Sequence, residues 1–241
     1  MKHKILDRAV SFCETLFLRL GLRTFHNSIY RLESRAIEES AIFIEQHLGT
    51  ASLFTSKKGG IWPFVMKQMI ESKTQGLWLE FGVRDGISAN FFARYLEDEN
   101  LRGKVENGCL YGFDKFEGIR NHWSSVNEPN GSFSRDSVVP IEPRYAQWIV
   151  GWVEDTLVDF LKCNTGQITF VHFDLDVFEP TLYALEQIAP RLASSAVILF
   201  DEFHGYPGWK LFERKALEMV LSSDKYEFIA FARKQAAIRL R

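Results

Sequence analysis

The sequence predicts a doubly wound α/β fold, in which helices cover both faces of a seven-stranded and mostly parallel sheet. Short apolar runs alternate with amphipathic stretches from Leu77 to Leu221. Strands that are apolar throughout are typical of parallel sheets buried on both faces. Two further strand-like runs around a basic turn end the chain and predict an antiparallel hairpin.

The expected strands are short and are followed by charged or glycine residues. They span 77–81, 109–113, 148–150, 168–173 and 196–200, and the terminal hairpin adds 226–232 and 236–240. Helical periodicity falls between them at 88–97, 156–163, 181–192 and 210–221.

An N-terminal helical extension is expected over residues 1–60, before a main domain over 61–241. Residues 5–22 repeat apolar side chains at helical spacing, but charges interrupt them at roughly every turn. This pattern excludes an ordinary signal peptide or a transmembrane segment. Residues 34–46 predict a second helix, and 50–60 a connector rich in Gly, Ser and Lys. The first helix packs on its own domain as a lid or on a partner in a homodimer, or else contacts a membrane surface peripherally.

Composition limits the classes of function. A chain of 241 residues with 46% hydrophobic content can bury one substantial core. Its 29 basic and 31 acidic residues are mixed, so no basic field points to a nucleic-acid partner. Three cysteines lie far apart without metal-ligand spacing, which argues against a secreted disulfide framework and favours a cytoplasmic protein.

Acidic residues end nearly every expected strand. Ligands of open α/β sheets bind outside the carboxyl ends of the strands, so these residues are the candidate site. In chain order the acids are Glu80, Asp114, Asp174, Asp176, Asp201 and Glu202.

The loop after the first strand suits a cationic nucleoside better than a dinucleotide. Gly82 and Gly86 alone are a weak phosphate-binding signal, and Glu80 and Asp85 would oppose a pyrophosphate there. S-adenosylmethionine carries an ammonium and a sulfonium, which the same carboxylates attract. Asp114, at the end of the second strand, is expected to accept both ribose hydroxyls. The alternative is that Glu80 caps a helix and Asp114 solvates a loop.

The acids after the fourth and fifth strands predict a metal site. Asp174 and Asp176 alternate along a strand, and Asp201 and Glu202 follow its expected neighbour. Clustered carboxylates repel unless a cation lies among them, and oxygen ligands suit Mg²⁺, Mn²⁺ or Ca²⁺. Alternatively, basic side chains pair with these acids at the surface, the candidates being Arg84, Arg191 and Lys210.

Five segments give the chain a family resemblance. They are residues 79–86, 112–118, 151–157, 173–181 and 200–203. In order and spacing they resemble class I S-adenosylmethionine-dependent methyltransferases of the macrocin O-methyltransferase type. The resemblance runs from about residue 78 to the end and implies a Rossmann-like fold whose terminal hairpin supplies the antiparallel strand.

The resemblance also implies roles for particular residues. It makes Asp174, Asp201 and Glu202 ligands of Mg²⁺ and Asp176 the general base. The donor site would include residues of the second, third and fourth segments, namely Lys115, Phe116, Gly151, Trp152 and Asp174. The sequence departs from the family at Leu175, Phe178 and Glu202, where glycine, tyrosine and a second aspartate are usual.

The expected reaction is methylation of a hydroxyl on a sugar or glycosylated small molecule. A metal is expected to assist it, because a metal lowers the pKa of a bound oxygen. His204 is an alternative base. The long segment 115–145 is expected to meet the acceptor through His122, Trp123, Phe133 and Arg135. A phenolic or catechol acceptor, a metal-dependent hydrolase and a non-catalytic nucleotide-binding module stay as alternatives.

Overall fold

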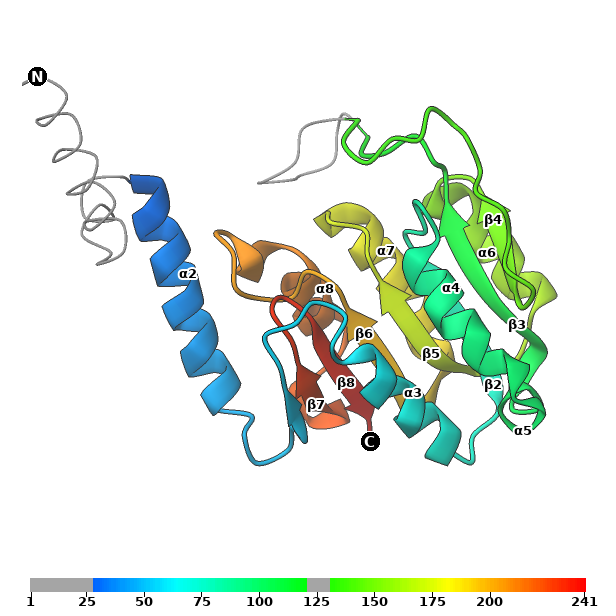
Figure 1. Ribbon diagram of the computed structural model, residues 1–241, viewed down its shortest axis with the longest axis horizontal. Helices are drawn as coiled ribbons and strands as arrows, with labels where there is room; N and C mark the ends of the chain where they lie inside the picture. The colour runs from blue at the N-terminus through cyan, green and yellow to red at the C-terminus, as the bar shows by residue number, and fades with distance from the viewer. Residues whose placement is uncertain (1–27, 121–130) are drawn as a thin grey trace, which may run out of the picture.

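The computed structural model describes residues 28–120 and 131–241. In this part of the chain a single sheet of eight strands runs in the order β1-β7-β8-β6-β5-β2-β3-β4 (Figure 1). Strand β8 is antiparallel to both neighbours, and the other paired strands are parallel. The predicted doubly wound fold with its C-terminal antiparallel hairpin is confirmed.

The strands of the sheet are β1 (Leu53–Phe54), β2 (Gly76–Phe81), β3 (Val105–Asp114), β4 (Ala146–Val150), β5 (Ile168–Phe173), β6 (Leu192–Phe200), β7 (Tyr226–Phe231) and β8 (Ala236–Leu240). The α-helices are α2 (Ser28–Glu45), α3 (Trp62–Glu71), α4 (Ile87–Arg94), α5 (Glu99–Arg102), α6 (Val153–Cys163), α7 (Phe178–Ile188) and α8 (Glu213–Val220). None of the helices in the described ranges is long and apolar enough to cross a membrane.

Two hydrophobic cores, one on each face, hold the sheet between its helices. Helices α3 and α4 cover one face, while α6, α7 and α8 cover the other (Figure 1). On the second face a row of stacked rings crosses four neighbouring strands, with centroids 5.0–5.4 Å apart: Phe113, Phe81, Phe173 and Phe200. Because these rings end their strands, they form an apolar floor directly beneath the carboxyl edge of the sheet.

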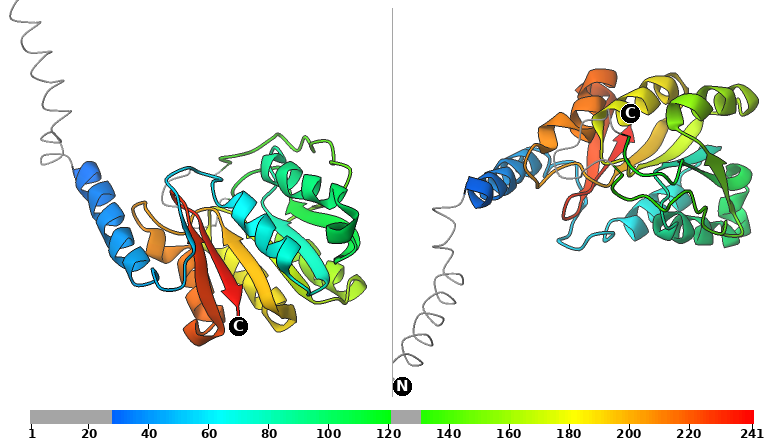
Figure 2. Two further views of the ribbon diagram at one scale, coloured as in Figure 1. Left: turned by 60° about the horizontal axis from the view of Figure 1, so that its bottom comes forward. Right: turned by 90° about the horizontal axis from the view of Figure 1, so that it is seen from above.

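Helix α2 extends away from the rest of the molecule (both views of Figure 2). Residues 28–35 of this helix are exposed, whereas Ala36, Ser40 and Phe43 are buried against the domain. Buried positions spaced by three and four residues identify one packed face on its C-terminal half. The helix expected at residues 5–22 lies outside the described residues.

Three local features differ from the sequence expectation. The connector 50–60 contains the short edge strand β1, which pairs with β7. Helix α3 was not predicted, although Pro63 lies in its first turn and Val65 is fully buried. Residues 189–192 are not α-helical, because a 3₁₀ turn containing Pro190 leads directly into β6.

Candidate active site

A pocket of about 350 Å³ lies at the carboxyl ends of the parallel strands. Residues from the loops after β2, β3, β4, β5 and β6 line it, together with a lysine before α3 and another in the β7–β8 turn. The lining residues used below are Lys58, Gly82, Asp114, Lys115, Phe133, Gly151, Trp152, Asp174, Asp176, Glu202, Tyr206, Phe212 and Lys234. The pocket therefore occupies the edge at which the sequence predicted a site.

The β2–α4 loop approaches the β5–α7 loop so closely that a side chain is excluded at Gly82. Its φ is +89°, and a Cβ atom there would lie 1.9 Å from the carbonyl oxygen of Asp174. Only glycine meets both conditions without strain. Gly82 thus brings the two halves of the pocket into contact.

Asp114 lines the pocket with a carboxylate fixed by backbone groups. Its Oδ2 accepts hydrogen bonds from the N–H groups of Val83 and Arg84, both at 2.8 Å, and Oδ1 accepts one from Phe116 at 2.6 Å. With two lone pairs on each oxygen, Oδ2 is saturated and Oδ1 keeps one acceptor position. Asp114 therefore has room for one ligand hydroxyl, where the sequence suggested two.

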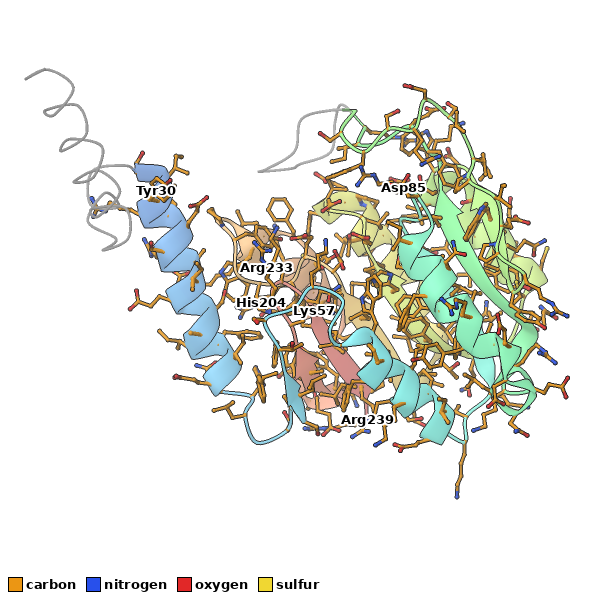
Figure 3. The ribbon with its side chains drawn as sticks, viewed as in Figure 1. Tyr30, Lys57, Asp85, His204, Arg233 and Arg239 are labelled. Atoms are coloured by element: carbon orange, nitrogen blue, oxygen red, sulfur yellow. The ribbon has the colours of Figure 1, made fainter. Side chains whose placement is uncertain are left out.

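Four predicted donor-site residues do not line the pocket, three of them in or just after β2. Glu80 is fully buried beneath it, and Asp85 pairs with Arg84 at 3.5 Å and with Arg135. Gly86 precedes helix α4 in a left-handed conformation, with φ +72°. Figure 3 shows Asp85 on the β2–α4 side of the carboxyl edge. The charge that we expected Asp85 to offer a ligand is neutralised by two arginines.

The other predicted donor-site residues take different positions. Lys115, Gly151 and Trp152 line the pocket, with Trp152 directly before helix α6. Phe116 is buried instead, and it contributes its backbone N–H to Asp114. Its φ of +61° is uncommon for a residue with a side chain, which marks a tightly specified turn.

The acids after β5 and β6 converge on the opposite half of the pocket. Asp174, Asp176 and Glu202 line it, while the side chain of Asp201 is buried just behind. Strand β5 ends at Phe173, so Asp176 faces the pocket through a left-handed backbone at φ +60° and not through strand alternation. Strained backbone of this kind clusters at functional sites.

Two lysines, neither of them predicted, pair with acids of this cluster. The Lys58 ammonium lies 2.9 Å from Asp201 Oδ2 and 3.7 Å from Glu202 Oε1. Lys234 lies 2.9 Å from Glu202 Oε2. Burial lowers the pKa of Lys58, but the carboxylates of Asp201, Asp174 and Glu202 outweigh it and hold that pKa above its usual range. Lys58 is therefore a cation and not a base.

Burial acts on the acids in the opposite direction. It raises the pKa of Asp174, and the charges of Asp201 and Asp176 raise it further. It also raises the pKa of Glu202, although Lys234 opposes the change. Glu213 on α8 is fully buried and accepts the N–H of Glu202 at 3.0 Å, and burial raises its pKa as well. The site thus favours any additional positive charge.

A buried histidine connects the two halves beneath the pocket. His172 Nδ1 lies 2.9 Å from Glu80 Oε1, which also accepts a hydrogen bond from the Ser88 hydroxyl at 2.5 Å. His172 Nε2 lies 4.0 Å from Asp201 Oδ1 and has no hydrogen-bond partner among the described residues. Through its two ring nitrogens His172 thus links Glu80 of β2 with Asp201 after β6.

The predicted metal ligands fit a divalent cation in part. Ligand atoms of Asp174, Asp201 and His172 all lie within 4.8 Å of one another. Glu202 does not belong to this group and is paired with two lysines. The donor set that fits is therefore two carboxylates with an unpartnered imidazole nitrogen, a combination that suits Mn²⁺ and other imidazole-binding metals better than Mg²⁺.

Two expectations for the acceptor side are met only in part. His204 does not line the pocket: it is 4% exposed, and its Nε2 contacts the backbone oxygen of Gln235 at 3.3 Å. Phe133 lines the pocket, whereas Arg135 hydrogen-bonds to the carbonyl of Val138 and pairs with Asp85. His122 and Trp123 lie outside the described residues.

Several site residues carry no signal in the sequence. Lys58 belongs to a run that is typical of a surface connector, and Lys234 and Gln235 belong to a basic hairpin turn. The basic residues suspected of pairing with the acids have other partners, since Lys210 binds Glu39 and Arg191 binds backbone carbonyls. Only the packing of the β7–β8 turn against the loop after β6 brings Lys58, Lys234 and Gln235 together at the site.

Comparison with protein families gives a match over the site-bearing part of the chain. The profile of a family described as a methyltransferase domain matches residues 79–203. This range is more than half of the chain and holds the candidate acids from Glu80 to Glu202. No sequence among curated proteins matches the chain.

Solved structures with similar folds include two methyltransferases. The calicheamicin methyltransferase CalS11 is 24% identical over 73% of this chain and 76% of its own, with a TM-score of 0.60. In a second structure CalS11 is described as a TDP-rhamnose 3'-O-methyltransferase. The O-methyltransferase NovP is 17% identical over 72% of this chain and 75% of its own, with a TM-score of 0.55. These likenesses extend the agreement in fold beyond the matched family domain.

Proposed function

The chain belongs to the methyltransferase-domain family, and on that premise we propose that it transfers the methyl group of S-adenosylmethionine to a hydroxyl of a sugar or glycosylated small molecule. One observation carries the proposal. A single pocket joins the glycine loop and Asp114 at the ends of β2 and β3 to the acids Asp174 and Asp176 after β5. A donor and an acceptor bound in these two halves would meet at Gly82.

The donor half suits a nucleoside that carries positive charge and no phosphate. The free acceptor position on Asp114 Oδ1 fits a ribose hydroxyl. The carboxylates of Asp114 and Asp174, which line the pocket, favour a sulfonium or an ammonium. A dinucleotide would place a pyrophosphate against the same acids, which is unfavourable. Asp174, at the junction of the two halves, is well placed to attract the positive end of the donor.

Methyl transfer needs alignment and one proton acceptor. The acceptor oxygen forms a bond to the methyl carbon as the carbon–sulfur bond breaks, and the hydroxyl proton passes to a base. Asp176 is the base that we propose, because its carboxylate lines the pocket beside Asp174 on a backbone fixed in the left-handed region. His204 takes no part in this proposal, since it is buried away from the pocket.

A divalent metal would be held by Asp174 and Asp201, with His172 as a neighbouring donor. Such an ion would lower the pKa of an acceptor hydroxyl in the same half of the pocket. Glu202 was expected to be the third ligand, and it would first have to exchange Lys58 and Lys234 for the metal. Metal assistance is thus supported by the cluster and by its need for positive charge.

A sugar acceptor is supported by the lining of the acceptor half and by analogy. Tyr206 and Phe212 offer aromatic surface, with a further ring from Phe133 in the loop after β3, and Asp176 with Lys234 offers polar contacts. CalS11 is described as acting on TDP-rhamnose. A catechol would use the same aromatic surface, so trial acceptors should include both classes.

The first test is calorimetric titration with S-adenosylhomocysteine, the demethylated donor, with NAD⁺ as the competing ligand and with or without Mg²⁺ or Mn²⁺. We expect micromolar binding of S-adenosylhomocysteine and none of NAD⁺. Absence of S-adenosylhomocysteine binding under every condition would contradict the proposed donor site and favour a hydrolase or a non-catalytic module.

Two substitutions separate the donor half from the acid cluster. Asp114→Ala removes three charge-assisted hydrogen bonds and one ligand contact, so we expect roughly 10- to 100-fold weaker S-adenosylhomocysteine binding. Asp174→Asn should abolish metal-dependent turnover of TDP-sugars or catechols and leave the affinity for S-adenosylhomocysteine, which has no sulfonium charge for Asp174 to attract, nearly unchanged. Asp159→Ala, at an exposed position on α6, is the control. Equal losses of donor binding in the Asp114 and Asp174 variants would rule out two distinct subsites.

A further inference from the structure

We propose that Lys58 is the built-in cation of the acidic cluster and that a divalent metal enters the cluster only by displacing it. The inference rests on the proposed function in one respect, because it takes Asp174 and Asp201 as the metal site. It adds a residue outside the matched family domain to the control of that site.

The position of the ammonium group carries the first step. Lys58 Nζ lies 2.9 Å from Asp201 Oδ2, an oxygen buried within the cluster, and 3.7 Å from Glu202 Oε1. Gln235 Nε2 donates to the other oxygen, Oδ1, which keeps one acceptor position and faces His172 Nε2. An ammonium group on Oδ2 and a metal ion bound between Asp201 and His172 would therefore compete for the charge of one carboxylate.

The backbone around Lys58 shows that this position is built into the fold. The N–H of Gly59 donates to Gln235 Oε1 at 2.8 Å, and the other end of the same fully buried amide binds Asp201. Gly60 closes the turn by donating to the carbonyl of Lys57 at 2.9 Å. One glutamine thus fixes both the turn that carries the lysine and the acid that the lysine meets.

The cluster still attracts positive charge when Lys58 is in place. His172 Nε2 is buried and unpartnered among the described residues, 4.0 Å from Asp201 Oδ1. Lys58 and Lys234 together oppose the carboxylates of Asp174, Asp176, Asp201 and Glu202, which leaves negative charge in excess. A divalent ion supplies one more positive charge than the lysine. Exchange is therefore favourable once the metal concentration is high enough to offset the loss of the Lys58–Asp201 ion pair.

The geometry also connects metal entry with access for the acceptor. Lys58 lines the same pocket as Asp176, and its side chain is 55% exposed, so it can swing towards solvent without unpacking the core. Displacement would clear the side chain from the acceptor half. The adjacent Lys57 is exposed and does not line the pocket, which makes it a matched control (Figure 3).

The test measures Mn²⁺ binding alone, by calorimetry and by the electron paramagnetic resonance signal of the free ion, without donor or acceptor. We expect Lys58→Met to bind Mn²⁺ on the order of tenfold more tightly than the wild type, since a competing charge has been removed. Lys57→Met should bind like the wild type, and Lys58→Arg, which keeps the cation, should stay weak. Adding Asp201→Asn to Lys58→Met should abolish the gain and so locate the ion in the cluster.

Two results would overturn the proposal. One is equal Mn²⁺ affinity in the wild type, Lys58→Met and Lys57→Met. The other is no Mn²⁺ binding in any of them, with the Lys58→Met variant shown to be folded by circular dichroism. Titration of the same samples with S-adenosylhomocysteine keeps the outcomes separate, because retained donor binding would leave the methyltransferase function standing while the exchange fails.

Discussion

Three aspartates of this pocket have the same chemistry but different partners, and the partners decide what each can do. Asp114 is held by three backbone N–H groups, so it is a fixed acceptor with one free position. Asp201 is held by a lysine and a glutamine and faces a histidine. Asp176 lines the open pocket on strained backbone. The three carboxylates thus differ in position and partners, which suits them to the separate roles proposed above.

His204 gives a prediction that separates a structural histidine from a catalytic one. Burial lowers its pKa below the ordinary value of 6.5, although backbone hydrogen bonds at Gln235 and Ala232 oppose the change. Because the pKa of His204 is lower in the folded state than in the unfolded state, the folded protein has its full stability above pH 6.5, where the side chain is neutral in both states. That stability is lost as the pH falls through 6.5 towards the folded-state pKa, because the unfolded chain binds the proton first.

We therefore expect His204→Gln to flatten the loss of stability between about pH 7 and pH 5, measured by urea denaturation at each pH. The catalytic constants for methyl transfer at pH 7.5 should change little. A large fall in kcat with an unchanged pH profile of stability would instead make His204 a base.

Among the elements, helix α2 affects the site indirectly, through the segment on which it packs. It packs on the segment that follows the acid pair, where Ser40 Oγ accepts the N–H of Gly205 at 2.8 Å and Glu39 binds Lys210 at 2.6 Å. Phe43 meets Phe228 edge to face at 5.3 Å, and Arg214 of α8 lies over its ring. The helix therefore supports the loop between Glu202 and α8 without entering the pocket.

Phe43→Ala tests that support. Phe43 is 8% exposed, and removing a large aromatic side chain from such a position costs about 3 kcal/mol of the free energy of unfolding. Ile37, which is 61% exposed on the same helix, is the matched control, and Ile37→Ala should change stability by less than about 0.5 kcal/mol. Urea denaturation measures both. Similar costs at the two positions would show that α2 is covered in solution on the face that is open here.

For the whole molecule, the sheet places one ligand-binding edge between two cores, and loops from five strands close on it. Three expectations are not tested by this structure and stay predictions. They are a cytoplasmic location, the lack of a nucleic-acid partner and a homodimer formed through the N-terminal helices. The domain division at residue 60 also stays a prediction. Residues on both sides of it contribute to the fold, since β1 extends the sheet and Lys58 lines the pocket.

Donor binding should stabilise the entire domain, because the donor half connects loops after β2, β3 and β4. At 100 times its Kd, S-adenosylhomocysteine should raise the free energy of unfolding by about 2.7 kcal/mol. The increase is measured by urea denaturation and should fall to about 0.4–1.4 kcal/mol in Asp114→Ala at the same ligand concentration, as the 10- to 100-fold weaker binding implies. NAD⁺ is the control ligand. An equal increase with NAD⁺ would contradict the charge argument for the donor half.

By itself the sequence determined the fold class, the seven principal strands and the edge of the sheet that carries the site. It could do so because these depend on local pattern: apolar runs specify buried strands, and acids directly after them must lie at the carboxyl edge. The acids Asp174 and Asp201, whose ligand atoms lie close together, were located in this way. So were Asp114 and Gly82 of the donor half.

Only the tertiary structure decided which charges meet. Glu80 lies near the end of β2 and Asp85 just after it, yet one is buried on His172 and the other is neutralised by arginines. Gly59, next to Lys58, and Gln235 lie 176 positions apart in the chain and meet only because β8 turns back beside β6. Ion pairs depend on distances across the fold, and periodicity along the chain carries no information about them.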